Sequence, residues 1–141
     1  MQLKDNGNPA TSELTPVFKI HAELCKGLAN EHRLAILYAL ASGEMCVTDI
    51  AAEIGMSIHS TSQHLRKLSE SLLLESRRQG KSVYYRIANE KYAQGCALIR
   101  QALVEQQRAK GQSLLAAELI DAVQKITVPG STGESIVDTV G

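Results

Sequence analysis

One segment of the 141-residue chain carries the residue types that proteins use to contact nucleic acid. An apolar stripe at helical spacing is expected to face inward and consists of Ile58, Thr61, Leu65, Leu68 and Leu72. The other faces hold short hydrogen-bonding side chains first, which suit the edges of bases, and cations further along, which suit phosphates. The candidate DNA-binding residues in this segment are Ser57, His59, Ser60, Ser62, Gln63, His64, Arg66 and Lys67.

A second cationic segment follows directly. Residues 73–78 and 82–87 have the composition of strands, and Gln79-Gly80-Lys81 is a turn that contains a glycine. We predict a hairpin whose tip lies along the DNA backbone or in a minor groove. A solvated loop is the alternative, but a basic hairpin without a binding role rarely follows two helices joined by a short turn. The candidate DNA-binding residues of the hairpin are Arg77, Arg78 and Lys81.

The charge of the chain is zero on average but unevenly placed. Fifteen Lys and Arg residues balance fifteen Asp and Glu residues. Residues 64–91 hold seven cations and three anions, a net charge of +4, whereas residues 112–141 hold one cation and four anions, a net charge of −3. This segregation predicts one basic face on a neutral molecule, so the overall neutrality does not exclude DNA binding.

The cysteines offer a second kind of chemistry. Cys25, Cys46 and Cys96 form no Cys-x-x-Cys pair, which indicates neither a disulfide framework nor a zinc ribbon. His21 lies one helical turn before Cys25, so the two share a helix face and are a usable pair of soft ligands. The three cysteines and His21 are effector candidates for a thiophilic metal or metalloid ion or for a redox signal. The alternative is that Cys25 and Cys96 are small buried hydrophobic residues.

Other function classes find little support. Thr48 or Ser57 as a nucleophile would need a base and an orienting acid, and neither is evident, so we predict no enzyme and no catalytic residue. The longest apolar run, residues 34–41, is too short to span a bilayer, and the N-terminal segment is polar. We expect a cytoplasmic protein with reduced thiols and no membrane partner.

Capping residues predict the first two helices. Thr15-Pro16 is a typical helix start, with the threonine as the cap and the proline at the first helical position. Asn30 caps a second helix over residues 31–42, which is apolar enough to belong to the core.

Two short helices follow. Thr48 caps the first of them, and Gly55-Met56-Ser57 makes a sharp turn, after which Ser57 caps a helix over residues 58–71. Two helices joined by a three-residue turn are a helix-turn-helix, and the basic hairpin behind them is a wing.

A long helix is predicted from Asn89 to about Lys110, with further amphipathic helix over 113–125 and a flexible tail over 127–141. The apolar stripe of the long helix is typical of a seam between two copies of a helix and consists of Tyr92, Cys96, Ile99 and Leu103. We predict an α+β, predominantly helical fold, a winged helix-turn-helix with N- and C-terminal dimerisation helices. Its parts are a flexible arm (1–13), a DNA-binding and dimerisation domain (14–110) and a C-terminal extension (111–141).

Three segments, GLANEHRLAILYAL, GEMCVTDIAAEIGMSIHSTSQHLRKL and RRQGKSVYYRI, resemble the ArsR/SmtB family of bacterial winged-helix repressors. The resemblance covers about residues 15–108. It implies a cytoplasmic homodimer built on its first and last helices, an operator with inverted repeats, and repression that ends when a ligand or oxidant binds. It also implies a recognition helix over 58–71 and a wing over 75–86. Matched to the family pattern, the residues near bases are Ser60, Ser62, Gln63 and His64, and those on phosphates are Arg77, Arg78 and Lys81.

The sequence departs from the family's known sensor patterns. The Cys-Val-Cys-Asp motif of arsenic and cadmium sensors reads Cys46-Val47-Thr48-Asp49 here. Residues 89–109 contain no His or Asp, so the last-helix site of zinc and nickel sensors is absent. The thiol positions of persulfide sensors hold Tyr38 and Val104.

The sequence thus predicts a homodimeric repressor that binds double-stranded operator DNA and is released by an effector, with Cys25 and Cys96 as candidate sensors. In an alternative, the cysteines are structural and the regulator responds to a non-metal ligand or to none. An alternative of another class is a dimeric protein-interaction module that does not bind DNA.

Overall fold

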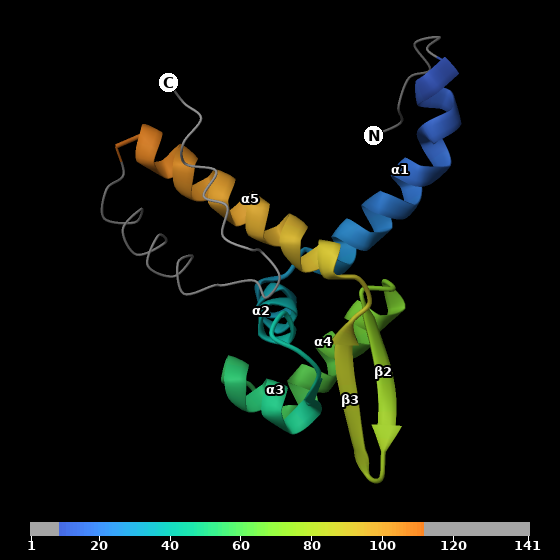
Figure 1. The fold of residues 1–141 in the computed structure, drawn as a ribbon, viewed down its shortest axis with the longest axis vertical. Coiled ribbons are helices and arrows are strands. Elements are labelled where there is room, and N and C mark those ends of the chain that lie inside the picture. Colours follow the sequence, from blue (N-terminus) through green and yellow to red (C-terminus); the bar gives the residue numbers. More distant parts are fainter. Residues whose placement is uncertain (1–8, 112–141) are drawn as a thin grey trace.

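The computed structural model describes residues 9–111, which form five helices and a three-stranded sheet. The elements are α1 (Pro9–Leu28), α2 (Glu31–Leu40), β1 (Met45–Cys46), α3 (Val47–Ile54), α4 (Ile58–Glu70), β2 (Leu74–Gln79), β3 (Ser82–Ile87) and α5 (Glu90–Ala109). Helices α2, α3 and α4 pack together with the hairpin β2–β3 beside them, while α1 and α5 diverge from this body in different directions (Figure 1). The predicted fold class is confirmed.

The start of the first helix was predicted wrongly. Helix α1 begins at Pro9, with Pro16 inside it, so part of the predicted flexible arm is helical. Pro9 suits a first turn as well as Pro16 does, and Ala10, Glu13 and Leu14 between them favour helix. Residues 1–8 and the C-terminal extension from residue 112 lie outside the described residues, together with the predicted helical segment 113–125 and tail 127–141.

Three helices have N-caps confirmed by hydrogen bonds, and two of these caps, Asn30 and Ser57, were predicted. The side-chain oxygen of Asn30 accepts from the backbone N–H groups of His32 and Arg33, at 2.9 and 3.1 Å. Ser57 Oγ accepts from the Ser60 N–H at 3.1 Å, and Asn89 accepts from the Lys91 N–H at 2.9 Å. Each cap satisfies backbone donors that the first turn of a helix leaves unpaired.

The predicted cap at Thr48 is wrong. Helix α3 begins at Val47, and its N-cap residue is Cys46, whose side chain makes no capping hydrogen bond. Thr48 is already helical, with Oγ1 3.2 Å from the Cys46 sulfur. The reason is β1, whose two residues pair with Tyr84 and Tyr85 of β3 and bring the chain into the helix earlier. A strand of two residues has no period to reveal it.

The sheet has the order β1-β3-β2, and both pairings are antiparallel. Gly80 has a φ of 61° in the turn between β2 and β3, a conformation that glycine adopts without steric cost. The register places Arg77 opposite Tyr84 and Glu75 opposite Arg86. Because side chains alternate along a strand, these four share one face of the hairpin.

The core lies among α2, α3, α4 and the base of the hairpin. Its most deeply buried side chains are Ile36, Leu37, Ile50, Thr61, Leu65, Leu68 and Leu73. The predicted inward stripe is confirmed at Thr61, Leu65 and Leu68 but wrong at its ends, since Ile58 is 54% exposed and Leu72 is 73% exposed. Ile58 is the first residue of α4, and Leu72 follows the helix with a φ of 64°, so neither side chain continues the buried face.

Candidate DNA-binding surface

The turn between α3 and α4 sets the direction of α4, the helix predicted to contact DNA. Gly55 ends α3 in the left-handed conformation, with a φ of 69°, and the Met56 N–H donates to the Ala51 carbonyl at 3.0 Å. The buried hydroxyl of Thr61 donates to the Ser57 carbonyl at 2.8 Å, so it carries no unpaired donor into the core. With Leu65 and Leu68 also buried, the opposite face of α4 is directed to solvent.

Most of the predicted DNA-binding residues of α4 lie on that solvent face. The exposed ones are Ser57, His59, Ser62, Gln63, Arg66 and Lys67. The amide nitrogen of Gln63 lies 3.1 Å from His59 Nε2, so the two side chains form one hydrogen-bonding group one helical turn apart. Ser60 is half-buried, and its N–H is held by the Ser57 cap. The structure therefore brings together a polar helix face able to reach the edges of bases.

His64 differs from the other candidates of α4. It is half-buried, and its ring centre lies 5.5 Å from that of His32 on α2. Burial lowers the pKa of His64, and the positive charge of Arg33 and the neighbouring His32 lower it further. The ring is therefore uncharged at neutral pH and belongs in part to the contact between α2 and α4.

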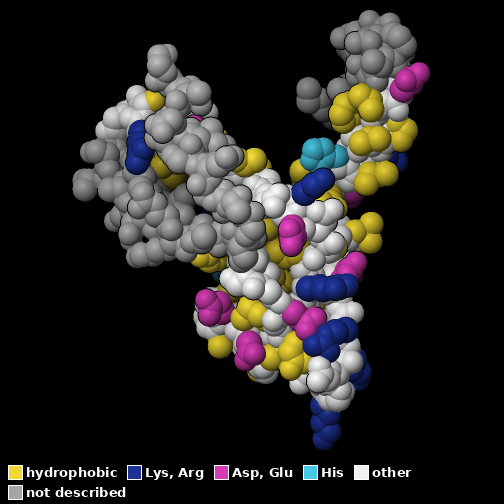
Figure 2. Space-filling model, viewed as in Figure 1, with side chains coloured by type: hydrophobic (Ala, Val, Ile, Leu, Met, Phe, Trp, Pro, Cys, Tyr) yellow, Lys and Arg dark blue, Asp and Glu magenta, His cyan; other side chains and the backbone are white. Residues whose placement is uncertain are grey.

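The hairpin carries the second group of predicted residues, and these do not all have the same surroundings. Figure 2 shows Lys and Arg side chains following the hairpin down to its tip. Arg78 and Lys81 are exposed and make no ion pair with any residue between 9 and 111. Arg86 pairs with Glu75 at 2.6 Å, and Arg77 pairs with Glu44.

Glu44 is a residue that the sequence reasoning missed. Its side chain is 29% exposed, and the hydrogen bond from Arg77 lowers the pKa of its carboxyl group. The Glu75–Arg86 ion pair could have been inferred from the sequence, because the hairpin register places the two residues opposite each other. Glu44 gave no such signal, because its place beside the hairpin depends on β1.

Two of the three thiols lie apart from this surface. Cys25 and Cys96 line one apolar groove of about 450 Å³ between α1 and α5, together with His21. Cys25 is exposed and Cys96 is buried, and burial raises the pKa of Cys96. Cys46, at the start of α3, lies outside this groove. No group of three or more His, Cys, Asp or Glu side chains in the described part of the chain is arranged to hold a metal ion.

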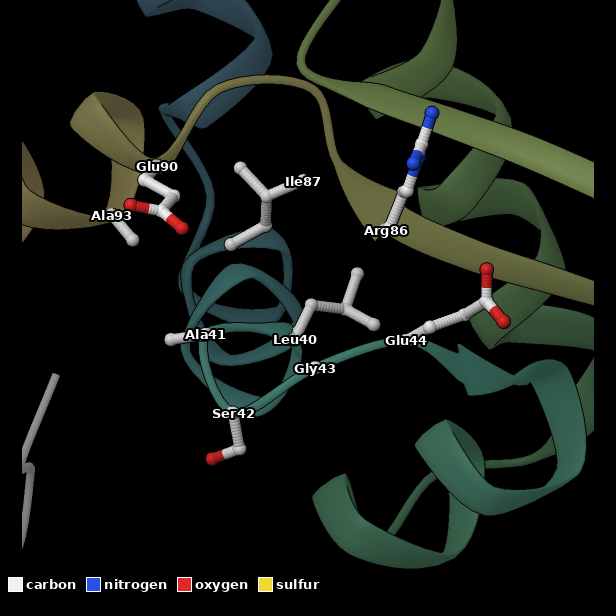
Figure 3. A pocket seen from close by; sticks show the side chains of 9 residues that line it. All are labelled: Leu40, Ala41, Ser42, Gly43, Glu44, Arg86, Ile87, Glu90 and Ala93. Atoms are coloured by element: carbon white, nitrogen blue, oxygen red, sulfur yellow. The ribbon is translucent and has the colours of Figure 1, made fainter. Parts of the chain in front are cut away.

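A second hollow, of about 470 Å³, lies between the end of α2, the end of β3 and the start of α5. Figure 3 shows Glu90 and Ala93 of α5 on one side and Arg86 on the other, with the Glu44 carboxylate directed toward the hairpin side. None of the predicted site residues lines it. Its residues are Leu40, Ala41, Ser42, Gly43, Glu44, Arg86, Ile87, Glu90 and Ala93.

Comparison with known proteins agrees with this geometry. The model of the ArsR family of bacterial regulatory proteins matches residues 30–76, which include α2, α3 and α4. A cadmium resistance transcriptional regulatory protein CadC homolog of Staphylococcus aureus is 36% identical over 86 residues, which are 60% of this chain and 69% of that protein. The chain belongs to the ArsR family.

Two further relatives show how far the ArsR match extends. Transcriptional regulator Rv0324 of Mycobacterium tuberculosis is 44% identical over 79 residues, which are 56% of this chain but 35% of that protein. The homodimeric winged helix-turn-helix DNA-binding domain of a Mycobacterium bovis protein, solved by NMR, has a TM-score of 0.58 and 34% identity. That match covers 76% of this chain and 91% of the domain. The chain thus spans only about a third to a half of the first curated relatives.

The ArsR relatives are named as transcriptional regulators. Within residues 9–111, no helix is long and apolar enough to cross a membrane. On the ArsR fold, this chain carries three surface features: the polar face of α4, the cationic hairpin, and the groove that holds two thiols.

Proposed function

We propose that this protein is a homodimeric, cytoplasmic repressor that binds double-stranded operator DNA. The observation that carries the proposal is the solvent face of α4, where Gln63 and His59 form a hydrogen-bonding group beside the cations Arg66 and Lys67. Hydrogen-bonding side chains such as Gln63 and His59 discriminate bases, and cations attract phosphates. The hairpin adds Arg78 and Lys81 on the same winged fold.

The dimer is proposed from the apolar side chains that α1 and α5 expose. Ile20, Ile99 and Leu103 are 66%, 64% and 50% exposed. Ile20 and Ile99 line one apolar groove, and contiguous exposed apolar surface is typical of a protein interface. Two copies of the polar helix face would then address the two halves of a palindromic operator.

The division of roles on the surface can be tested with two variants. Gln63→Ala should change the preference between a matched and a scrambled operator, because an amide reads bases. Lys81→Ala should weaken binding to both sequences alike and reduce the dependence on salt, because an ammonium group contacts phosphate. Binding is measured by fluorescence anisotropy over a series of salt concentrations, with Lys110→Ala, at the far end of α5, as the control.

A uniform loss of affinity in both variants would contradict the assignment of roles. A wild-type protein without salt-dependent binding to the promoter of its own gene would favour the alternative, a dimeric protein-interaction module.

The groove between α1 and α5 supports a second candidate function, the sensing of an effector. Cys25 of α1 and Cys96 of α5 line the same apolar groove from its two sides. We propose that they respond to a thiophilic metal or metalloid ion or to an oxidant. Within one protomer they supply only two sulfur ligands, with His21 on the same groove.

The sensing proposal is tested on the protein–operator complex. As(III), Cd(II), Zn(II) and peroxide are each titrated into wild type and into the Cys25→Ser/Cys96→Ser variant, with Cys46→Ser as the control. Release of DNA in wild type and in Cys46→Ser, but not in the double variant, is expected. If no agent releases the DNA, the cysteines are structural and the effector is of another kind.

A further inference from the structure

Arg77 reaches across the whole sheet. It lies on β2 opposite Tyr84 of the central strand β3, and Tyr84 in turn lies opposite Cys46 of β1. The guanidinium carbon lies 4.7 Å from the centre of the Tyr84 ring. The guanidinium also forms an ion pair with Glu44, which precedes β1. The Arg77 side chain thus connects β2 to β3 and to the residue that precedes β1.

The hydrogen bonds of Arg77 use much of its donor capacity. Nε donates to both carboxylate oxygens of Glu44 at 2.9 Å, and Nη2 donates to the same carboxylate. Nη1 donates to the side-chain oxygen of Gln79 at 2.7 Å. Every nitrogen of the guanidinium therefore has a partner within the protein, and its charge is neutralised by a carboxylate on the same molecule.

The position of Glu44 gives this contact a mechanical role. Glu44 lies in the segment between the end of α2 and β1, and β1 leads directly into α3, the first helix of the helix-turn-helix. The pairing of β1 with β3 consists of only two residue pairs. The Glu44–Arg77 contact is therefore an additional connection between the hairpin and the body that carries the recognition helix.

We propose that Glu44 and Arg77 are positioning residues, which fix the direction of the wing relative to the helix-turn-helix, and that Arg77 does not bind phosphate. The phosphate contacts of the wing then fall to Arg78 and Lys81, which make no ion pair within the described residues. This inference rests on the proposed DNA binding, and it revises the role that the resemblance implied for Arg77.

The opposite hypothesis makes different predictions. In this hypothesis Arg77 binds phosphate, and Glu44 pairs with Arg77 only while no DNA is bound. Removal of the Glu44 carboxylate would then leave Arg77 unpaired and strengthen binding to DNA. Loss of Arg77 would also lower the number of phosphates neutralised, which appears as a change of about 0.9 in the slope of log affinity against log salt.

The test compares wild type, Glu44→Ala, Arg77→Ala, the double variant, Arg77→Lys and Lys81→Ala in operator binding over a series of salt concentrations. We expect Glu44→Ala and Arg77→Ala each to lower affinity about twofold to fivefold, as for loss of an exposed ion pair. The double variant should lose no more than either single variant, since the two residues act as one unit. The salt slope should change in Lys81→Ala and stay unchanged in Arg77→Ala.

Arg77→Lys separates positioning from charge. Lysine keeps the positive charge but lacks the planar fork that binds both carboxylate oxygens, so it should behave like Arg77→Ala. Retained affinity in Arg77→Lys, tighter binding in Glu44→Ala, or a reduced salt slope in Arg77→Ala would each overturn the inference.

Hydrogen exchange in the DNA-free protein tests the positioning role by itself. The amides of β2 and β3 should exchange faster in Glu44→Ala and Arg77→Ala, while those of α4 stay as in wild type. Unchanged exchange in the hairpin would contradict the positioning role. Failure of wild type to bind any operator would instead contradict the proposed function, and the exchange result would still stand.

Discussion

Arg77 and Arg78 are neighbours in the sequence, but their side chains lie on opposite faces of β2 and have different surroundings. Because successive side chains of a strand point to opposite faces, Arg77 reaches Tyr84 and Glu44 while Arg78 stays without an ion pair in the described part of the chain. His64 shows the same principle on a helix, since its ring contacts His32 while Gln63 stays exposed. At the scale of residues, type alone does not decide which groups are available to DNA.

The contact of His64 with His32 predicts a pH dependence of stability. Because the pKa of His64 is lowered in the folded state, the unfolded chain takes up the proton first as the pH falls below about 6.5. His64 therefore stabilises the fold fully above that pH, and the stabilisation is lost on acidification. Urea unfolding of wild type between about pH 7.5 and 5.5 should show a falling midpoint, and the fall should be smaller in His64→Gln.

His59→Gln, on the exposed face of the same helix, is the control for that measurement. An equal fall of the midpoint in wild type and in His64→Gln would show that another group causes the pH dependence.

At the scale of elements, the helices are placed by a few close contacts. Gly27 in α1 lies so near α4 that an added Cβ would overlap the Cβ and Oγ of Ser71. The Arg33 side chain of α2 donates to the Gly27 carbonyl at 2.6 Å, which connects the same point of α1 to a second helix. The first helix is thereby attached to the body at its C-terminal end.

Gly27→Ala should lower the free energy of unfolding by about 1–3 kcal/mol, the usual cost of overfilling a packed contact. In an exposed helix the same change is stabilising, so the sign of the effect reports the contact. Thermal unfolding measures it. The variant Gly27→Ala/Ser71→Gly should recover most of the loss, and an unchanged or raised melting temperature in Gly27→Ala would refute the contact.

At the scale of the whole molecule, neutrality conceals two different surfaces. The hairpin carries four cations, of which Arg77 and Arg86 are paired with carboxylates and Arg78 and Lys81 have no described ion pair. The basic face is therefore concentrated on α4 and the tip of the wing. Helices α1 and α5, which carry the exposed apolar side chains Ile20, Ile99 and Leu103, diverge from the body that holds α4 and the hairpin (Figure 1).

Ile99→Glu is expected to convert the dimer to monomer and to weaken operator binding, because it places a charge in the proposed apolar interface. Sedimentation velocity and operator titration measure the two effects. Gln101→Glu adds the same negative charge on an exposed position of α5 and should remain dimeric. A dimeric Ile99→Glu protein would show that the interface lies elsewhere.

The sequence by itself determined the helix-turn-helix, the hairpin and most of the exposed polar residues of α4. These depend on short-range signals: the caps Asn30 and Ser57, the turn at Gly55, and a period that buries Thr61, Leu65 and Leu68. The same local reasoning placed the start of α1 too late, because two prolines offered equivalent starts.

Only the tertiary structure decided which of these side chains are engaged by the protein itself. Glu44 and Arg77 are 33 residues apart in the chain, and Cys25 and Cys96 reach one groove from the first and last described helices. No pattern along the sequence encodes such pairs, because they exist only after β1 joins the sheet and α1 and α5 meet at the body of the fold. Local periodicity specifies faces, whereas packing specifies the partners of each face.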